Sequence, residues 1–176
     1  MSDHPHLVYR ALVPKHECGA TCYLPSLADS LNLMPPNPTT SLDPVVASDL
    51  QQRAAAVAHH AYAPYSKFRV GAAVLLTDGT IVTGCNVENA SYRLTVCAEQ
   101  AAIAAAVSLH GPTIRIRAIA VANLNDAASQ PCGACRQTIH EFSTPDTVIF
   151  FPGDKGAISH ATTAELLPAA FLLINS

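Results

Sequence analysis

The alternation of apolar and polar positions becomes regular at Asp43 and predicts a folded domain from there onward. Apolar residues within 45–62 recur at helical spacing, and Asp43-Pro44 supplies an N-cap followed by proline at the first helical position. The spacing predicts a helix that runs to about Tyr62, and Pro64 prevents it from continuing.

The rest of this domain alternates between strand-like and helix-like segments. Asp78-Gly79 is a strong hairpin signal between two strand-like runs, and Gly111-Pro112 stops an alanine-rich helix. The predicted strands are 68–77, 81–87, 114–121 and 147–151, and the predicted helices are 97–110, 131–142 and a turn at 163–167. This order indicates a layered α/β sandwich built on a mixed sheet.

Residues 1–42 differ from this pattern because prolines are concentrated at the start of the chain. Seven of the 13 prolines lie at or before Pro44. Proline at this density prevents a continuous helix and interrupts strand ladders. We predict that 1–42 form a proline-rich N-terminal arm, partly ordered or docked, and that 43–176 form the catalytic domain.

Composition excludes several classes of protein. The chain has 176 residues, of which 49% are hydrophobic and 13% charged, so it can bury a core. Ten Lys and Arg against 13 Asp and Glu give a net charge of −3, which disfavours binding to a phosphate backbone. No apolar run is long enough for a membrane span, and no signal-peptide pattern is visible. Six cysteines in such a chain suit a reducing compartment, so we expect a cytoplasmic protein without nucleic-acid or membrane partners.

The most informative residues are three cysteines at two predicted helix starts, in Cys97-Ala98-Glu99 and Pro131-Cys132-Gly133-Ala134-Cys135. Cys132 and Cys135 are three residues apart, which places both thiols on one side of a first helical turn. The partial positive charge at a helix N-terminus favours thiolate over thiol. If the two helix starts meet, the three thiolates suit a tetrahedral zinc ion.

The fourth zinc ligand distinguishes a catalytic site from a structural one. A catalytic zinc keeps this position for water, and Glu99 next to that water is the expected general base. A structural zinc would take Cys85, His110 or His140 as its fourth ligand. Alone, Glu99 is merely a favourable charge at a helix start; beside the cysteines it favours catalysis.

Several further segments carry a resemblance to a known family. They are 65–72 (YSKFRVGA), 84–92 (GCNVENASY), Cys135-Arg136-Gln137 and Leu166-Leu167-Pro168. Together with the cysteine motif, which matches the zinc-deaminase pattern H-x-E…P-C-x-x-C with Cys in place of His, residues 45–172 resemble the small homotetrameric cytidine deaminases. The resemblance implies a three-layer α/β/α cytidine-deaminase-like fold with a mixed five-stranded sheet.

The same resemblance implies an activity and a set of site residues. The activity is zinc-dependent hydrolytic deamination of cytidine and 2′-deoxycytidine to uridine and 2′-deoxyuridine plus ammonia, a pyrimidine-salvage reaction, with one Zn²⁺ per subunit in a homotetramer. The implied zinc ligands are Cys97, Cys132 and Cys135, and the implied catalytic residue is Glu99. The implied substrate contacts are Phe68 against the pyrimidine ring, Asn86 and Glu88 at the ribose hydroxyls, and Ala90 and Tyr92 reaching into a neighbouring subunit's site.

Two alternatives stay open, and one position departs from the family. The alternatives are a deaminase of another cytosine-containing nucleoside or antibiotic, and a non-catalytic zinc-stabilised paralogue. Gln100 stands directly after the Cys-Ala-Glu triplet, where many family members have arginine. Three thiolates leave a zinc centre formally negative, and Gln100 supplies hydrogen bonds but no positive charge. Arg136 and Arg93 are candidates to supply that charge.

Overall fold

A five-stranded sheet forms the centre of the domain. The structure, a computed structural model, describes residues 42–173, so the arm predicted over 1–42 lies almost entirely outside the described residues. The strands are β1 (Val70–Leu76), β2 (Ile81–Cys85), β3 (Ile116–Asn123), β4 (Val148–Pro152) and β5 (Ile158–Thr162), in the spatial order β2-β1-β3-β4-β5. β3 and β4 pair in parallel and all other neighbours antiparallel, which confirms the mixed sheet.

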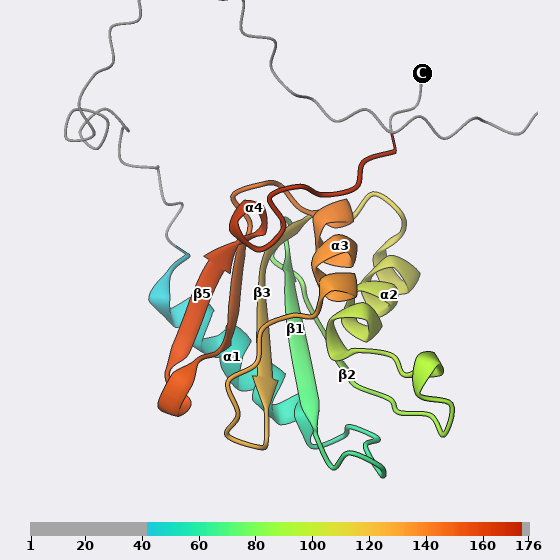
Figure 1. Ribbon diagram of the computed structural model, residues 1–176. Coiled ribbons are helices and arrows are strands. Elements are labelled where there is room, and N and C mark those ends of the chain that lie inside the picture. Colours follow the sequence, from blue (N-terminus) through green and yellow to red (C-terminus); the bar gives the residue numbers. More distant parts are fainter. Residues whose placement is uncertain (1–41, 174–176) are drawn as a thin grey trace, which may run out of the picture. The chain divides into compact units, whose positions relative to one another are not determined.

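Helices cover both faces of this sheet (Figure 1). The helices are α1 (Pro44–Ala58), α2 (Ala98–His110), α3 (Gly133–Phe142) and the short α4 (Thr163–Leu166), with 3-10 turns η1 (Tyr92–Leu94) and η2 (Asp154–Gly156). α1 packs on one face, while α2 and α3 lie on the other, so the predicted three-layer α/β/α arrangement is confirmed. Among the helices of residues 42–173, none has the length and apolar character needed to cross a membrane.

The central strand β1 shows why the sheet is buried on both sides. Ala72, Val74 and Leu76 belong to the core beneath α2 and α3, whereas Ala73 and Leu75 belong to the core beneath α1. Successive side chains of a strand point to opposite faces, so a strand covered on both faces is apolar throughout.

Two glycines let the helices approach the sheet closely. A Cβ atom on Gly71 would collide with the carbonyl oxygen of Ala54 in α1, and one on Gly84 would collide with the backbone of Ala102 in α2. A side chain at Gly84 would therefore push α2 away from β2. The close approach sets the position of the first turn of α2, where Cys97 and Glu99 lie.

The observed elements differ from the predicted ones at two instructive places. Asp43 caps α1 as predicted, its carboxylate accepting the Val45 N–H at 2.8 Å. However, α1 ends at Ala58 instead of Tyr62, because the Tyr62 N–H donates to the Asn86 carbonyl and holds that residue in extended backbone. The residue pattern also missed β5, a short strand with exposed and half-buried residues at the edge of the sheet.

Candidate active site

The three cysteines meet where α2 and α3 begin. Cys97 and Cys132 are the N-cap residues of the two helices, and neither side chain caps its own helix. Cys135 lies in the first turn of α3 and is fully buried. The three sulfur atoms lie within 4.8 Å of one another, and the sulfurs of Cys97 and Cys132 are 4.0 Å apart. The sequence prediction that two helix starts converge is therefore confirmed.

This cluster has the size and composition of a zinc site. Zinc–sulfur bonds of about 2.3 Å in tetrahedral geometry separate the sulfurs by about 3.8 Å, close to the observed spacing. Within residues 42–173 the cluster contains three ligands only, so Cys85, His110 and His140 do not join it. Among residues 42–173, the donors thus fit a zinc ion whose fourth position is left to another ligand, as in catalytic sites.

The pKa values of Cys97, Cys135 and Glu99 are shifted from the ordinary values of these groups. A hydrogen bond from the Cys135 thiol lowers the pKa of Cys97 to about 7. The same interaction, together with burial, raises the pKa of Cys135 above that of an ordinary thiol. Three thiolates this close repel one another, so they can all be ionised only around a cation. Burial also raises the pKa of Glu99, which is 5% exposed, and a divalent cation nearby acts in the opposite direction.

The cluster opens into a cavity of about 250 Å³ that brings together most of the predicted site residues. One side, here called the thiol wall, consists of Cys97, Glu99, Cys132 and Cys135. The other side, called the loop wall, consists of Ser66, Phe68, Asn86 and Glu88. The remaining lining residues are Val70, Thr95, Ala98, Val121, Ser129 and Gln130. Seven of the nine predicted site residues therefore share one cavity.

In the loop wall, Glu88 is a hydrogen-bond acceptor for the segment before β1. One carboxylate oxygen accepts the N–H groups of Tyr65 at 2.9 Å and Ser66 at 3.3 Å, and the other accepts the Ser66 hydroxyl. The Ser66 hydroxyl is the main cause of the lowered pKa of Glu88. Although Glu88 is only 6% exposed, it stays ionised because these donors replace water.

Asn86 holds the same segment from its other end. Its side-chain oxygen accepts the Val70 N–H at 2.8 Å, and its side-chain nitrogen donates to the Phe68 carbonyl at 2.9 Å. The observed role of Asn86 and Glu88 is thus to shape the backbone that presents Phe68. Each also keeps spare capacity, since a carboxylate has about four acceptor sites and an amide two donors.

The two other predicted contacts, Ala90 and Tyr92, do not line this cavity. Both are exposed, Tyr92 to 62%, and they flank or belong to η1. The Tyr92 ring lies beside that of Tyr65, with ring centres 6.0 Å apart. Their expected role in a neighbouring subunit's site stays a prediction.

Sequence reasoning missed several lining residues. Ser129 and Gln130 immediately precede the cysteine motif, so their position in the chain was an available signal. Thr95 has the same kind of signal, since it lies two residues before Cys97. Its hydroxyl is buried and has no hydrogen-bond partner among the described residues.

Arg136, a candidate for the positive charge near the sulfurs, makes no hydrogen bond to them in the described part of the chain. Its guanidinium donates to the carbonyls of Pro131 at 2.8 Å and Leu166 at 3.1 Å and to the Gln130 side chain at 3.0 Å. These acceptors are oxygens, none of them a cysteine sulfur. Arg136 instead ties α3 to the chain that enters it and to the C-terminal segment.

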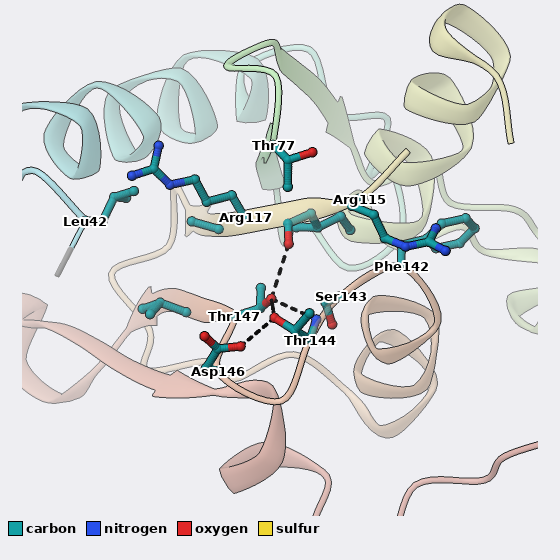
Figure 2. Close-up of a pocket in the computed structure, with 12 residues that line it drawn as sticks. Leu42, Thr77, Arg115, Arg117, Phe142, Ser143, Thr144, Asp146 and Thr147 are labelled. Carbon is teal, nitrogen blue, oxygen red and sulfur yellow. Dashed lines mark hydrogen bonds between the residues drawn. The ribbon is translucent and has the colours of Figure 1, made fainter. Parts of the chain in front are cut away.

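A second cavity, of about 150 Å³, is lined by polar groups that bond mainly to one another (Figure 2). The Thr147 hydroxyl donates to the Ile116 carbonyl at 3.2 Å and accepts the Thr144 N–H at 3.1 Å, and the Thr144 hydroxyl donates to Asp146. Arg115 and Arg117 extend in opposite directions in Figure 2. Because these hydroxyl and carboxylate groups bond to one another and the guanidinium groups diverge, this cavity offers no convergent site.

Comparison with known proteins gives the same class of protein as the geometry. Residues 45–151 match the family model "Cytidine and deoxycytidylate deaminase zinc-binding region". A cytidine deaminase of Sporosarcina psychrophila is 48% identical over 111 residues, which cover 63% of this chain and 80% of that protein. A cytidine deaminase of Mycobacterium tuberculosis is 43% identical over 122 residues, covering 69% of this chain and 86% of that one.

Solved structures agree. The crystal structure of cytidine deaminase from Burkholderia pseudomallei matches with a TM-score of 0.64 and 40% identity, covering 70% of this chain and 98% of that chain. That from Mycobacterium tuberculosis matches with a TM-score of 0.63 and 42% identity, covering 72% and 98%. The fold and the three-thiol site define a zinc-dependent hydrolytic deaminase. Within that class, the chain belongs to the cytidine and deoxycytidylate deaminase family.

Proposed function

We propose that this protein hydrolyses cytidine and 2′-deoxycytidine to uridine and 2′-deoxyuridine with release of ammonia. One observation carries the proposal: a buried glutamate, Glu99, lies beside a cluster of three thiols that leaves a fourth metal position open toward a cavity. The similarity to cytidine deaminases from two bacteria supports the choice of reaction.

The chemistry divides between the metal and Glu99. Cys97, Cys132 and Cys135 would hold a zinc ion, which would supply Lewis-acid activation of a water molecule. Glu99 is placed to accept a proton from the water that attacks C4 of the cytosine ring and to deliver this proton to ring nitrogen N3. Glu99 then moves a second proton to the departing amine, so that ammonia leaves and a carbonyl remains at C4.

The lining of the cavity favours a nucleoside over a nucleotide. Among the residues that line it are two carboxylates, Glu88 and Glu99, and neither lysine nor arginine. A 5′-phosphate bound there would lack a cationic partner and would face negative charge. A volume of about 250 Å³ also suits a small ligand and not a polymer.

The substrate contacts follow from the loop wall. We assign the pyrimidine face to Phe68, whose backbone is held on both sides. The spare donor of Asn86 and the spare acceptor site of Glu88 would bind the ribose hydroxyls, which need one acceptor and one donor. Because both groups are already held in place, little side-chain freedom is lost when the nucleoside binds.

A homotetramer with sites shared between subunits is supported by an exposed apolar surface next to the cavity. Six large side chains of this surface, all at least 40% exposed, are Tyr62, Tyr65, Val87, Tyr92, Leu94 and Val96. Such a concentration of apolar side chains is typical of a protein–protein interface. A second copy covering it would explain why Ala90 and Tyr92 are exposed and do not line their own cavity. We place the enzyme in cytoplasmic pyrimidine salvage, and the free thiols of Cys85, Cys97, Cys132 and Cys135 suit that reducing compartment.

The experiment is a substrate panel with zinc analysis on the purified chain. We expect one zinc per chain and ammonia release from cytidine and deoxycytidine, with far slower release from free cytosine and cytidine 5′-monophosphate. Zinc without ammonia release from any of these would identify a non-catalytic paralogue. Release from another cytosine nucleoside alone would assign that substrate instead.

A further inference from the structure

The segment that presents Phe68 to the cavity has a strained backbone. Lys67, directly before Phe68, has a φ angle of +61°. This left-handed region is unfavourable for residues other than glycine, so the conformation persists only where surrounding contacts hold it. Several of these contacts come from the loop wall itself. Three others come from the loop after β3: two from the Asn125 side chain, and one from the Leu124 N–H, which donates to the Arg69 carbonyl at 3.1 Å.

Asn125, in the loop after β3, bonds to the backbone on both sides of Phe68. Its side-chain oxygen accepts the Arg69 N–H at 3.1 Å, and its side-chain nitrogen donates to the Lys67 carbonyl at 3.3 Å. The Phe68 N–H itself donates to the Ser66 hydroxyl at 2.9 Å. The peptide groups around Phe68 are therefore bonded to side chains and not to a neighbouring strand.

The loop that carries Asn125 is itself braced and leads to the thiol wall. The Asn123 side chain accepts the Asn125 N–H at 2.9 Å and donates to the carbonyl of Ala127 at 2.7 Å and the hydroxyl of Ser129 at 2.9 Å. Three residues after Ser129 the chain reaches Cys132. One loop thus braces the segment that presents Phe68 and delivers a metal ligand.

We infer that Asn125 is a positioning residue for substrate binding, which acts by holding Phe68 against the pyrimidine ring. The inference rests on the proposed function, since it takes Phe68 as the residue that contacts the ring. Without Asn125, Lys67 can leave its left-handed conformation, and the Phe68 side chain loses its fixed direction. Pre-organisation of this kind lowers the free-energy cost of binding, so its loss should raise KM and leave kcat nearly unchanged.

A double-mutant cycle tests whether Asn125 acts through Phe68. We expect Asn125→Ala to raise KM for cytidine about 3- to 10-fold, the equivalent of one or two hydrogen bonds, with kcat within about twofold. In a Phe68→Ala background, the same substitution should change KM by less than about twofold. Asn125→Asp, which keeps the acceptor for Arg69 but loses the donor to Lys67, should have an intermediate effect. Equal effects in both backgrounds would overturn the inference.

Hydrogen exchange gives a readout that does not depend on the reaction. In Asn125→Ala, the Arg69 amide should exchange faster, while the zinc content stays unchanged. Asp78→Ala is the matched control: this exposed turn residue also accepts a backbone N–H, that of Thr80 at 2.9 Å, but lies outside the cavity. The control should leave both KM and the exchange at Arg69 unaltered. If the Arg69 amide exchanges at an unchanged rate in Asn125→Ala, the inference is refuted. If this amide exchanges faster but Phe68→Ala has the KM of wild type, the proposed role of Phe68 is refuted instead.

Discussion

The thiol wall and the loop wall of the cavity satisfy their polar groups in opposite ways. In the thiol wall, three sulfurs and a buried carboxylate lie together, and one hydrogen bond among the thiols lowers the pKa of one sulfur while raising that of another. In the loop wall, Asn86 and Glu88 are equally buried, yet their side chains accept and donate well-formed hydrogen bonds to the segment 65–70.

The contrast indicates which wall depends on a ligand from outside the chain. Three thiols held this close cannot all be ionised without a cation, so the thiol wall reaches its fully charged form only by binding a metal. The loop wall needs no added group because the side chains of Asn86 and Glu88 already have hydrogen-bond partners within the chain. We therefore expect substitutions in the thiol wall to affect metal and chemistry, and those in the loop wall to affect binding.

The largest effect is expected for Cys135→Ser. A hydroxyl is a poor zinc ligand beside two thiolates, so the variant should lose most of its zinc and its activity should fall to background. Zinc content and ammonia release measure both. Cys85→Ser is the control, since Cys85 is half-buried and outside the cluster, and it should keep one zinc. A Cys135→Ser protein with full zinc and full activity would contradict the assigned ligand set.

Glu99→Gln should separate chemistry from metal binding in the same wall. The amide keeps the shape of the side chain but cannot accept the proton, so kcat should fall by about 10²- to 10⁴-fold with zinc retained. Glu141→Gln, the same change at an exposed position of α3, should leave kcat unchanged. Turnover near the wild-type rate in Glu99→Gln would remove Glu99 from the reaction.

Glu88→Gln should weaken binding and leave the metal in place. The change removes the charged acceptor that binds the N–H groups of Tyr65 and Ser66. Because hydrogen bonds to charged groups contribute about 1.5–3 kcal/mol, we expect KM to rise about 10- to 100-fold. Steady-state kinetics at fixed zinc content would show this. Glu165→Gln is a matched control, because Glu165 also has a lowered pKa from hydrogen bonds, to Thr162, but lies outside the cavity. If both variants raised KM alike, the loop wall would have no special role.

The smallest effect concerns stability at acid pH. The pKa of Glu88 is lowered from 4.5 in the folded protein, chiefly by the Ser66 hydroxyl. Its contribution to stability is therefore complete above the unfolded value of 4.5 and is lost as pH falls through the lower folded value. Urea unfolding between about pH 6 and about pH 3, on either side of this value, should show a shallower decline of stability for Glu88→Gln than for wild type. Parallel curves would show that Glu88 gains no net stabilisation from its partners.

The two walls also differ in how far their features could be predicted from the amino-acid sequence alone. Helix starts at Cys97 and Cys132 are local features, visible from the spacing of neighbouring residues, and the structure confirms them within two positions. The edge strand β5 left no such pattern, because its side chains are exposed or half-buried and its position depends on pairing with β4. The resemblance to a family, and not the pattern, supplied the fifth strand.

Side-chain partners were less predictable than elements. Asn86 and Glu88 were correctly expected on one face, since two residues apart on a strand share a face. Their bonds to 65–70 depend on a segment about 20 residues away in the chain, whose approach no local signal encodes. For the same reason, the hydrogen bonds of Arg136 to the Pro131 and Leu166 carbonyls could not be predicted from the sequence.

Residue identity and short-range periodicity specify the donor set of three cysteines and one glutamate, the helix starts that carry them and the layered α/β class. Packing of the whole domain establishes that the sulfurs meet without a fourth ligand from residues 42–173 and that Asn86 and Glu88 support Phe68. It also brings Asn125 to the same segment from a distant loop. Such contacts depend on the register of the sheet and the close approach of helices to Gly71 and Gly84, which arise only when the whole domain packs.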